Sequence, residues 1–165
     1  MPELTPTGAT LRNLSVTAAP GSRHTEAGRG VRVPGIDECL LQAMVVPGAR
    51  GASVVDWTSG LALGTVGEAP GGDHEATAAE TAELARMAAE YPSFATDETP
   101  APDGTKGLPV EDLIVTTRTG YHVVRFVETT FDSSVFLHLW LDRDTGNLAL
   151  ARLRLADLAE RLILG

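Results

Sequence analysis

The sequence predicts an α/β fold of the α+β type, with three helices and a five-stranded antiparallel sheet. Three segments carry apolar residues at helical spacing. Five short segments rich in Val, Ile, Leu and Thr are separated by turns that contain Gly. The two groups of strands flank the middle helix, which gives the order α-β-β-α-β-β-β-α. We therefore expect one antiparallel sheet with helices packed on its faces.

The first helix is expected to begin near Ile36. Ile36, Leu40, Ala43 and Met44 fall on one helical face. Pro47-Gly48 should end this helix, because proline cannot continue it and glycine favours a turn.

A hairpin follows, with strands at residues 52–55 and 61–66. The segment 56–60, Asp-Trp-Thr-Ser-Gly, supplies the turn chemistry between them. Gly64 and Gly67 fit a bulge or a strand end.

The middle helix is expected from about His74 to Tyr91. Asp73 is a good N-cap, and Pro92 stops the helix. Residues 92–109 hold four of the ten prolines among acidic residues, Gly and Thr, which predicts a long surface loop.

Three strands are expected next, at residues 112–117, 121–127 and 135–141. Thr119-Gly120 turns the chain between the first two. The third is apolar at nearly every position, so it should be central and covered on both faces. A final helix then runs from Asn147 to the end. Its apolar residues recur at 3–4 spacing: Leu148, Ala151, Leu155, Leu158 and Leu162.

Length and composition fit one ordered domain. The chain has 165 residues, 43% of them hydrophobic, enough for a core of its own. Residues 1–33 lack periodicity and aromatic residues and are predicted to be a flexible N-terminal arm. The domain should then span residues 34–165.

The charge distribution argues against nucleic-acid binding. The chain carries a net charge of −9. Residues 1–33 hold four Arg and two Glu, a charge of +2, so the rest of the chain carries −11. A domain with this negative charge would be repelled by the phosphates of a nucleic acid. No apolar run approaches the roughly 18–20 residues of a membrane span. The start of the chain does not resemble a signal peptide, and Cys39 is the single cysteine, so we expect a cytoplasmic protein. Twelve Arg against one Lys suggest a bacterial source.

The helix and hairpin together resemble the Roadblock (dynein light chain) superfamily. The similarity rests on the hairpin at residues 47–63, the Ala-rich segment 76–91, the Gly-turn hairpin 113–127, and the last strand and Leu-rich helix 137–162. It covers roughly residues 34–165. The resemblance implies a homodimer whose two sheets join and whose middle helices pack side by side. It also implies regulation or scaffolding of a Ras-like small GTPase.

The middle helix carries two contrasting apolar faces. Leu84, Met87, Ala88 and Tyr91 share one arc, which we expect to face the chain's own sheet. A nearly opposite line consists of four small residues: Ala78, Ala82, Ala85 and Ala89. Small residues let two helices approach closely, so these alanines are the predicted dimer interface. The alternative is that these alanines are present for their helix propensity alone and that they face solvent.

Few residues suggest chemistry. His122 and His138 lie in predicted strands and could pair across them to hold a metal, but no Cys or nearby carboxylate supports this, so a structural role is favoured. The segment 142–147 resembles part of a calcium loop but lacks glycine at the sixth position and glutamate at the twelfth. A turn with a helix cap is the favoured interpretation.

Three further features lack the context that function would need. Gly71-Gly72 precedes a helix without a phosphate-loop signature, and Ser59 is not in a nucleophile elbow. Cys39 is expected to pack. We therefore predict no catalytic residue, metal or cofactor.

Three functions are compatible with these observations. The first is a non-catalytic homodimer that regulates a Ras-like small GTPase or scaffolds its signalling complex. The second is a ligand-sensing domain of PAS or profilin-like type, which would need a large cavity lined by Trp57, Phe126 or Trp140. The third, a small enzyme, would need a cluster of titratable groups that the sequence does not show.

Overall fold

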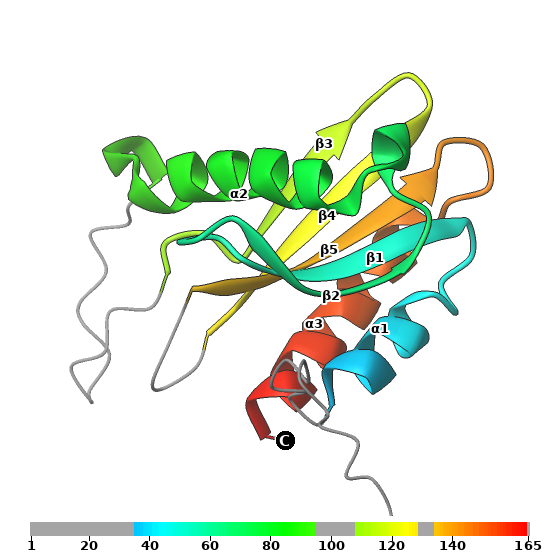
Figure 1. The fold of residues 1–165 in the computed structure, drawn as a ribbon, viewed down its shortest axis with the longest axis horizontal. Coiled ribbons are helices and arrows are strands. Elements are labelled where there is room, and N and C mark those ends of the chain that lie inside the picture. Colours follow the sequence, from blue (N-terminus) through cyan, green and yellow to red (C-terminus); the bar gives the residue numbers. More distant parts are fainter. Residues whose placement is uncertain (1–34, 95–107, 129–133, 165) are drawn as a thin grey trace, which may run out of the picture. The chain divides into compact units, whose positions relative to one another are not determined.

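The computed structural model describes residues 35–94, 108–128 and 134–164. The predicted arm (1–33) and most of the predicted loop (92–109) lie outside this part, so both stay predictions. The elements run in the predicted order (Figure 1). They are α1 (Ile36–Ala43), β1 (Ala49–Asp56), β2 (Leu61–Gly67), η1 (Pro70–Gly72), α2 (His74–Glu90), η2 (Pro92–Phe94), β3 (Asp112–Thr116), β4 (Gly120–Val127), β5 (Val135–Asp142) and α3 (Leu148–Leu164).

The five strands form one antiparallel sheet in the order β2-β1-β5-β4-β3. The predicted central strand is central: β5 pairs with β1 on one side and β4 on the other, and residues 136–141 are all buried. Helix α2 crosses one face of the sheet, and α1 and α3 lie together on the other (Figure 1). The predicted fold is therefore confirmed.

The α1/α3 face holds an aliphatic core. Leu40 from α1 and Leu155 from α3 are 2% and 1% exposed, and they pack with Val54 and Leu139 of the sheet. Fully burying such a side chain stabilises a fold by about 1.5–3 kcal/mol. On this face the helices supply much of the bulk that fills the core.

Gly64 lets α1 lie directly on β2. Gly64 pairs with Val54, next to a register shift in the β1–β2 ladder, and it lies beneath α1. A Cβ built at Gly64 would come within 2.7 Å of Ile36 Cγ2 and 3.1 Å of a Leu40 methyl carbon. Any larger residue would force these side-chain atoms to shift, which explains the glycine inside a strand.

Side-chain caps begin the two long helices. The Asp73 carboxylate accepts a hydrogen bond from the Ala76 backbone N–H at 3.0 Å, and the Asn147 side chain accepts one from Leu150 N–H at 3.0 Å. Both satisfy donors that the first helical turn leaves free. The predicted N-cap at Asp73 is thus confirmed.

The segment considered as a partial calcium loop is a turn. Asp142 Oδ1 accepts hydrogen bonds from the backbone N–H groups of Thr145 and Asp144, at 3.0 and 2.9 Å. Hydrogen bonds from Thr145 and Asp144 lower the pKa of this carboxyl. Within the described ranges, no three His, Cys, Asp or Glu side chains gather as metal ligands would. None of the described helices is long and apolar enough to cross a bilayer.

Candidate functional site

The structure reverses the two faces that the sequence predicts for α2. Ala78, Ala82 and Ala85 are at most 1% exposed and pack against the chain's own sheet, with Ala89 partly buried beside them. The prediction that these four alanines meet a second copy is wrong in orientation, because their own sheet already covers them. The alternative of a wet alanine line is wrong for the same reason.

The bulk on this side comes from the sheet. Phe126 and Phe136 meet edge to face, with ring centroids 6.4 Å apart, and Val55 and Val124 pack around them. A sheet face that already carries two phenylalanines leaves room only for small helix residues, so alanines bring α2 close to it. An assignment by side-chain size alone therefore exchanges the buried and the exposed face of α2.

The large apolar residues of α2 point to solvent. Leu84, Met87 and Tyr91 are 39%, 41% and 53% exposed, and Phe94, just beyond the helix, is 52% exposed. Of the arc predicted to face the sheet, Ala88 is the one member that is buried. We call Leu84, Met87, Tyr91 and Phe94 the outer stripe. Leu84, Met87 and Tyr91 recur at helical spacing, and exposed apolar residues that gather in this way are typical of an interaction surface.

Acidic residues surround the outer stripe. Glu80, Glu83 and Glu90 are exposed on the same helix. The single arginine of α2, Arg86, is held by Glu83 at 2.8 Å and donates a hydrogen bond to the Trp57 carbonyl at 2.9 Å. Glu80 stands one turn before the stripe begins, and a charged residue on that line was the sequence signal that it faces water.

The two strand histidines do pair, but with each other. His122 Nδ1 and His138 Nε2 lie 3.1 Å apart, and the rings stack with centroids 5.3 Å apart. Burial and the neighbouring His122 lower the pKa of His138 to about 3, and burial lowers the pKa of His122. Both shifts favour the neutral rings, and the hydrogen bond between them uses one nitrogen of each. This arrangement is structural.

Other singled-out residues offer no chemistry either. Cys39 is 5% exposed, and burial raises the pKa of its thiol to about 11, so it stays a protonated packing residue. Ser59 donates a hydrogen bond to the Asp56 carboxylate at 2.9 Å within the β1–β2 turn. Gly71 and Gly72 have positive φ angles and shape the entry to α2.

The cavities give no support to a ligand sensor. Trp140 borders a cavity of about 10 Å³, which is room for one water at most. Phe126 borders a surface depression of about 270 Å³ against α3, whose lining includes Glu111, Arg125 and Glu128. In the part of the chain that the structure describes, neither of these two spaces is the apolar chamber between sheet and helix that such a sensor would need.

The architecture is similar to solved structures from bacteria. MglB of Myxococcus xanthus matches with a TM-score of 0.64 and 17% sequence identity, over 84% of this chain and 92% of MglB. A Roadblock/LC7 domain from Streptomyces avermitilis matches with a TM-score of 0.54 and 19% identity, over 76% of this chain and 92% of that domain. The chain has the Roadblock/LC7 fold.

A third structure agrees with this conclusion. The gliding protein MglB from Thermus thermophilus matches the Roadblock/LC7 fold of this chain with a TM-score of 0.60 and 17% identity, over 82% of this chain and 93% of that one. No protein-family model matches the sequence, and no curated protein matches it. The resemblance drawn from residues 34–165 is thus confirmed at the level of the fold.

Proposed function

We propose that this chain is a non-catalytic homodimer that binds and regulates a Ras-like small GTPase, or scaffolds a signalling complex that contains one. The observation that carries the proposal is the outer stripe on α2 of a Roadblock/LC7 fold. The resemblance associates this fold with paired middle helices and with small GTPases, and a gliding protein, MglB, has a similar fold. The described residues contribute shape and surface, with His122, His138 and Cys39 committed to packing.

In the proposed dimer the outer stripes of two α2 helices face each other. Leu84 and Met87 form the α2 part of the stripe, so a second copy would cover apolar area that the monomer leaves in water. The glutamates beside the stripe would approach their counterparts, so added salt should strengthen the dimer by screening them.

The dimer is tested with the double variant Leu84→Glu/Met87→Glu. We expect light scattering to give the monomer mass, because two carboxylates per copy would have to be buried at the contact. The matched control is Leu153→Glu, which changes a 67% exposed leucine of α3 on the opposite side of the sheet and should leave the mass dimeric. Equal masses for the wild type and the double variant would refute this interface.

The GTPase is tested separately. The wild-type protein is used to capture partners from its native host, and GTP hydrolysis and nucleotide release by any recovered GTPase are measured with and without it. We expect one of the two rates to change. If no GTPase is recovered, and one from the same host is unaffected, the regulatory proposal fails even if the dimer stands.

A further inference from the structure

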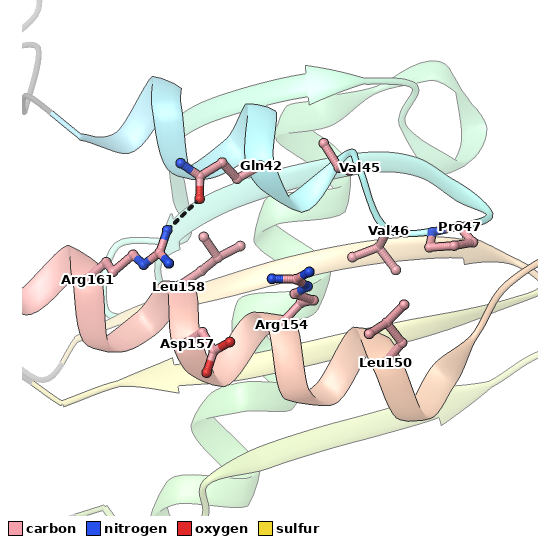
Figure 2. Close-up of a pocket in the computed structure, with 9 residues that line it drawn as sticks. All are labelled: Gln42, Val45, Val46, Pro47, Leu150, Arg154, Asp157, Leu158 and Arg161. Carbon is pink, nitrogen blue, oxygen red and sulfur yellow. Dashed lines mark hydrogen bonds between the residues drawn. The ribbon is translucent and has the colours of Figure 1, made fainter.

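The charges around the hollow between α1 and α3 are balanced. Figure 2 shows this space of about 200 Å³, with side chains of both helices around it. Its rim carries Arg154 and Arg161 but also Asp157, and Glu38 lines a space of about 220 Å³ beside it. The unequal charge of the described residues lies elsewhere, on the elements around β2.

Strand β2 forms an open edge of the sheet. It pairs with β1 on one side, and no described strand pairs with it on the other. An edge strand leaves a row of backbone N–H and C=O groups to which another extended chain can bond. The outer side of β2 can therefore accept a further strand.

Strand β2 has none of the side chains that protect many sheet edges. Residues 61–67 include no charged residue and no proline. Leu61 and Leu63 are 58% and 48% exposed, although both are large and apolar. A register shift leaves Leu63 without a partner on β1, and the regular run 64–67 follows it. The edge thus offers a regular stretch of backbone next to two uncovered leucines.

Most of the negative charge belongs to the elements that pack around β2. Residues 35–90, which hold α1, β1, β2 and α2, carry nine Asp and Glu against two Arg, a charge of −7. The other described residues carry seven Asp and Glu against six Arg, a charge of −1. Both arginines of the first group already form ion pairs, Arg50 with Glu68 and Arg86 with Glu83.

Helix α2 brings part of this charge over the edge. His74 Nε2 lies 3.2 Å from the Gly67 carbonyl oxygen at the end of β2, and a Cβ built on Gly60, just before β2, would lie 3.6 Å from Ala79 Cα. The first turns of α2 therefore run along β2 in the opposite direction. Glu75 is exposed and precedes Ala79 by four residues, so it lies on the same flank of the helix.

Helix α1 adds negative charge on the other face of β2. Ile36 and Leu40 lie against Gly64, and Asp37 and Glu38 follow Ile36 in the first turn of the helix. A chain segment that ran along β2 would therefore have acidic residues of both helices near it.

We propose that the outer edge of β2 pairs with an extended segment of a partner protein that carries basic and aliphatic side chains. The backbone of the segment would continue the sheet, and its aliphatic side chains would cover Leu61 and Leu63. Its Lys or Arg side chains would meet the acidic residues of α1 and α2. This surface differs from the outer stripe, so the proposal does not depend on the dimer.

A second copy of this chain is the less favoured occupant. Pairing of two β2 edges would bring together two regions that each carry a charge of −7, and like charges oppose such a contact. A nucleic acid or an anionic membrane would be repelled for the same reason. A basic segment is the occupant whose charge complements the edge.

The test is a selection of random 12-residue peptides displayed on phage, carried out on the full-length protein. We expect the wild type to enrich peptides in which aliphatic residues alternate with Lys or Arg. The double variant Leu61→Lys/Leu63→Lys should bind these peptides at least about tenfold more weakly, because it places two positive charges on the edge. Leu153→Lys is the matched control, because it changes a 67% exposed leucine of α3 and should bind as the wild type does.

Two further measurements locate the binding. With an enriched peptide bound, hydrogen exchange should slow at backbone amides of residues 61–67, where edge N–H groups gain partners, and should stay unchanged in α3. Glu75→Lys should weaken the binding, whereas Glu160→Lys, at an exposed position of α3, should not. Thermal unfolding of each variant confirms that it is folded.

Several results would overturn the proposal. They are that no peptide is enriched, that the enriched peptides ignore the replacements at Leu61 and Leu63 or at Glu75, or that exchange along β2 does not change. A further one concerns the second copy. If Leu84→Glu/Met87→Glu stays dimeric in light scattering and becomes monomeric only when both β2 leucines are also replaced, a second copy occupies the edge.

Discussion

The two faces of the sheet are filled in opposite ways. Under α2, the sheet supplies the large side chains, Phe126 and Phe136, and the helix supplies alanines. Under α1 and α3, the helices supply leucines such as Leu40 and Leu155. A consequence is that α2 has its large apolar residues left for the outside, whereas the other two helices bury theirs. The amount of apolar surface on a helix thus does not show which side is buried.

The largest expected effect tests the α2 face directly. Ala85 is fully buried against the sheet, so Ala85→Glu places an unpaired carboxylate in the core. We expect the free energy of unfolding to fall by about 3–5 kcal/mol in urea titrations. Ala79→Glu, at an exposed position of the same helix, is the control and should be nearly neutral. A stable Ala85→Glu protein that changes only its oligomeric mass would restore the orientation predicted from the sequence.

An intermediate effect concerns acid stability on the same face. The folded-state pKa of His138 is about 3, below its ordinary value of 6.5. The unfolded chain therefore takes up a proton as the pH falls below about 6.5, while the folded chain does not until about 3. Stability present at pH 7 is lost across this window, by about 2 kcal/mol at pH 5.

The measurement is urea unfolding at pH 7 and pH 5 for the wild type and for His138→Gln. The variant should lose less stability between the two pH values, because it lacks the titrating ring. His74→Gln, in which a half-exposed ring that bonds to the Gly67 carbonyl is replaced, should follow the wild type. Parallel losses in wild type and His138→Gln would show that the buried pair does not set acid stability.

The smallest expected effect tests whether the two faces of the sheet differ in anything besides their packing. Asp73 caps α2, and Asn147 caps α3 on the other side, each through one hydrogen bond of 3.0 Å. Replacing either residue with alanine should cost about 1 kcal/mol in thermal or urea unfolding. Similar losses would place the difference between the faces in their cores. A loss several times larger at one cap would show that one helix end depends on more than its cap.

The sequence was sufficient for the elements and their order. Asp73 and Pro92 bounded α2 because a cap and a proline act locally, and the unbroken apolar run of residues 135–141 indicated a central strand. The orientation of α2 was not predictable in the same way. It depends on Phe126 and Phe136, which follow the helix by more than thirty residues and reach it only through the sheet.

The contact between α1 and α3 was beyond sequence reasoning for a related reason. Gln42 and Arg161, which bridge it, are 119 residues apart. A lone arginine on a helix is ordinarily a solvated charge. Only the tertiary fold shows that Arg154 and Arg161 line the same hollow as Val46 and Leu158. Val45 likewise follows the end of α1 in the sequence, and only the fold places it beside α3.

Gly64 determines how closely α1 can lie on β2. It lies on β2, behind α1, and the space that its missing methyl leaves is filled by Ile36 and Leu40. An alanine there would press on these two side chains, and both would have to shift within the contact between α1 and the sheet. The fit of α1 on the sheet thus depends on one missing carbon atom, at a position that the sequence indicates only as a bulge or a strand end.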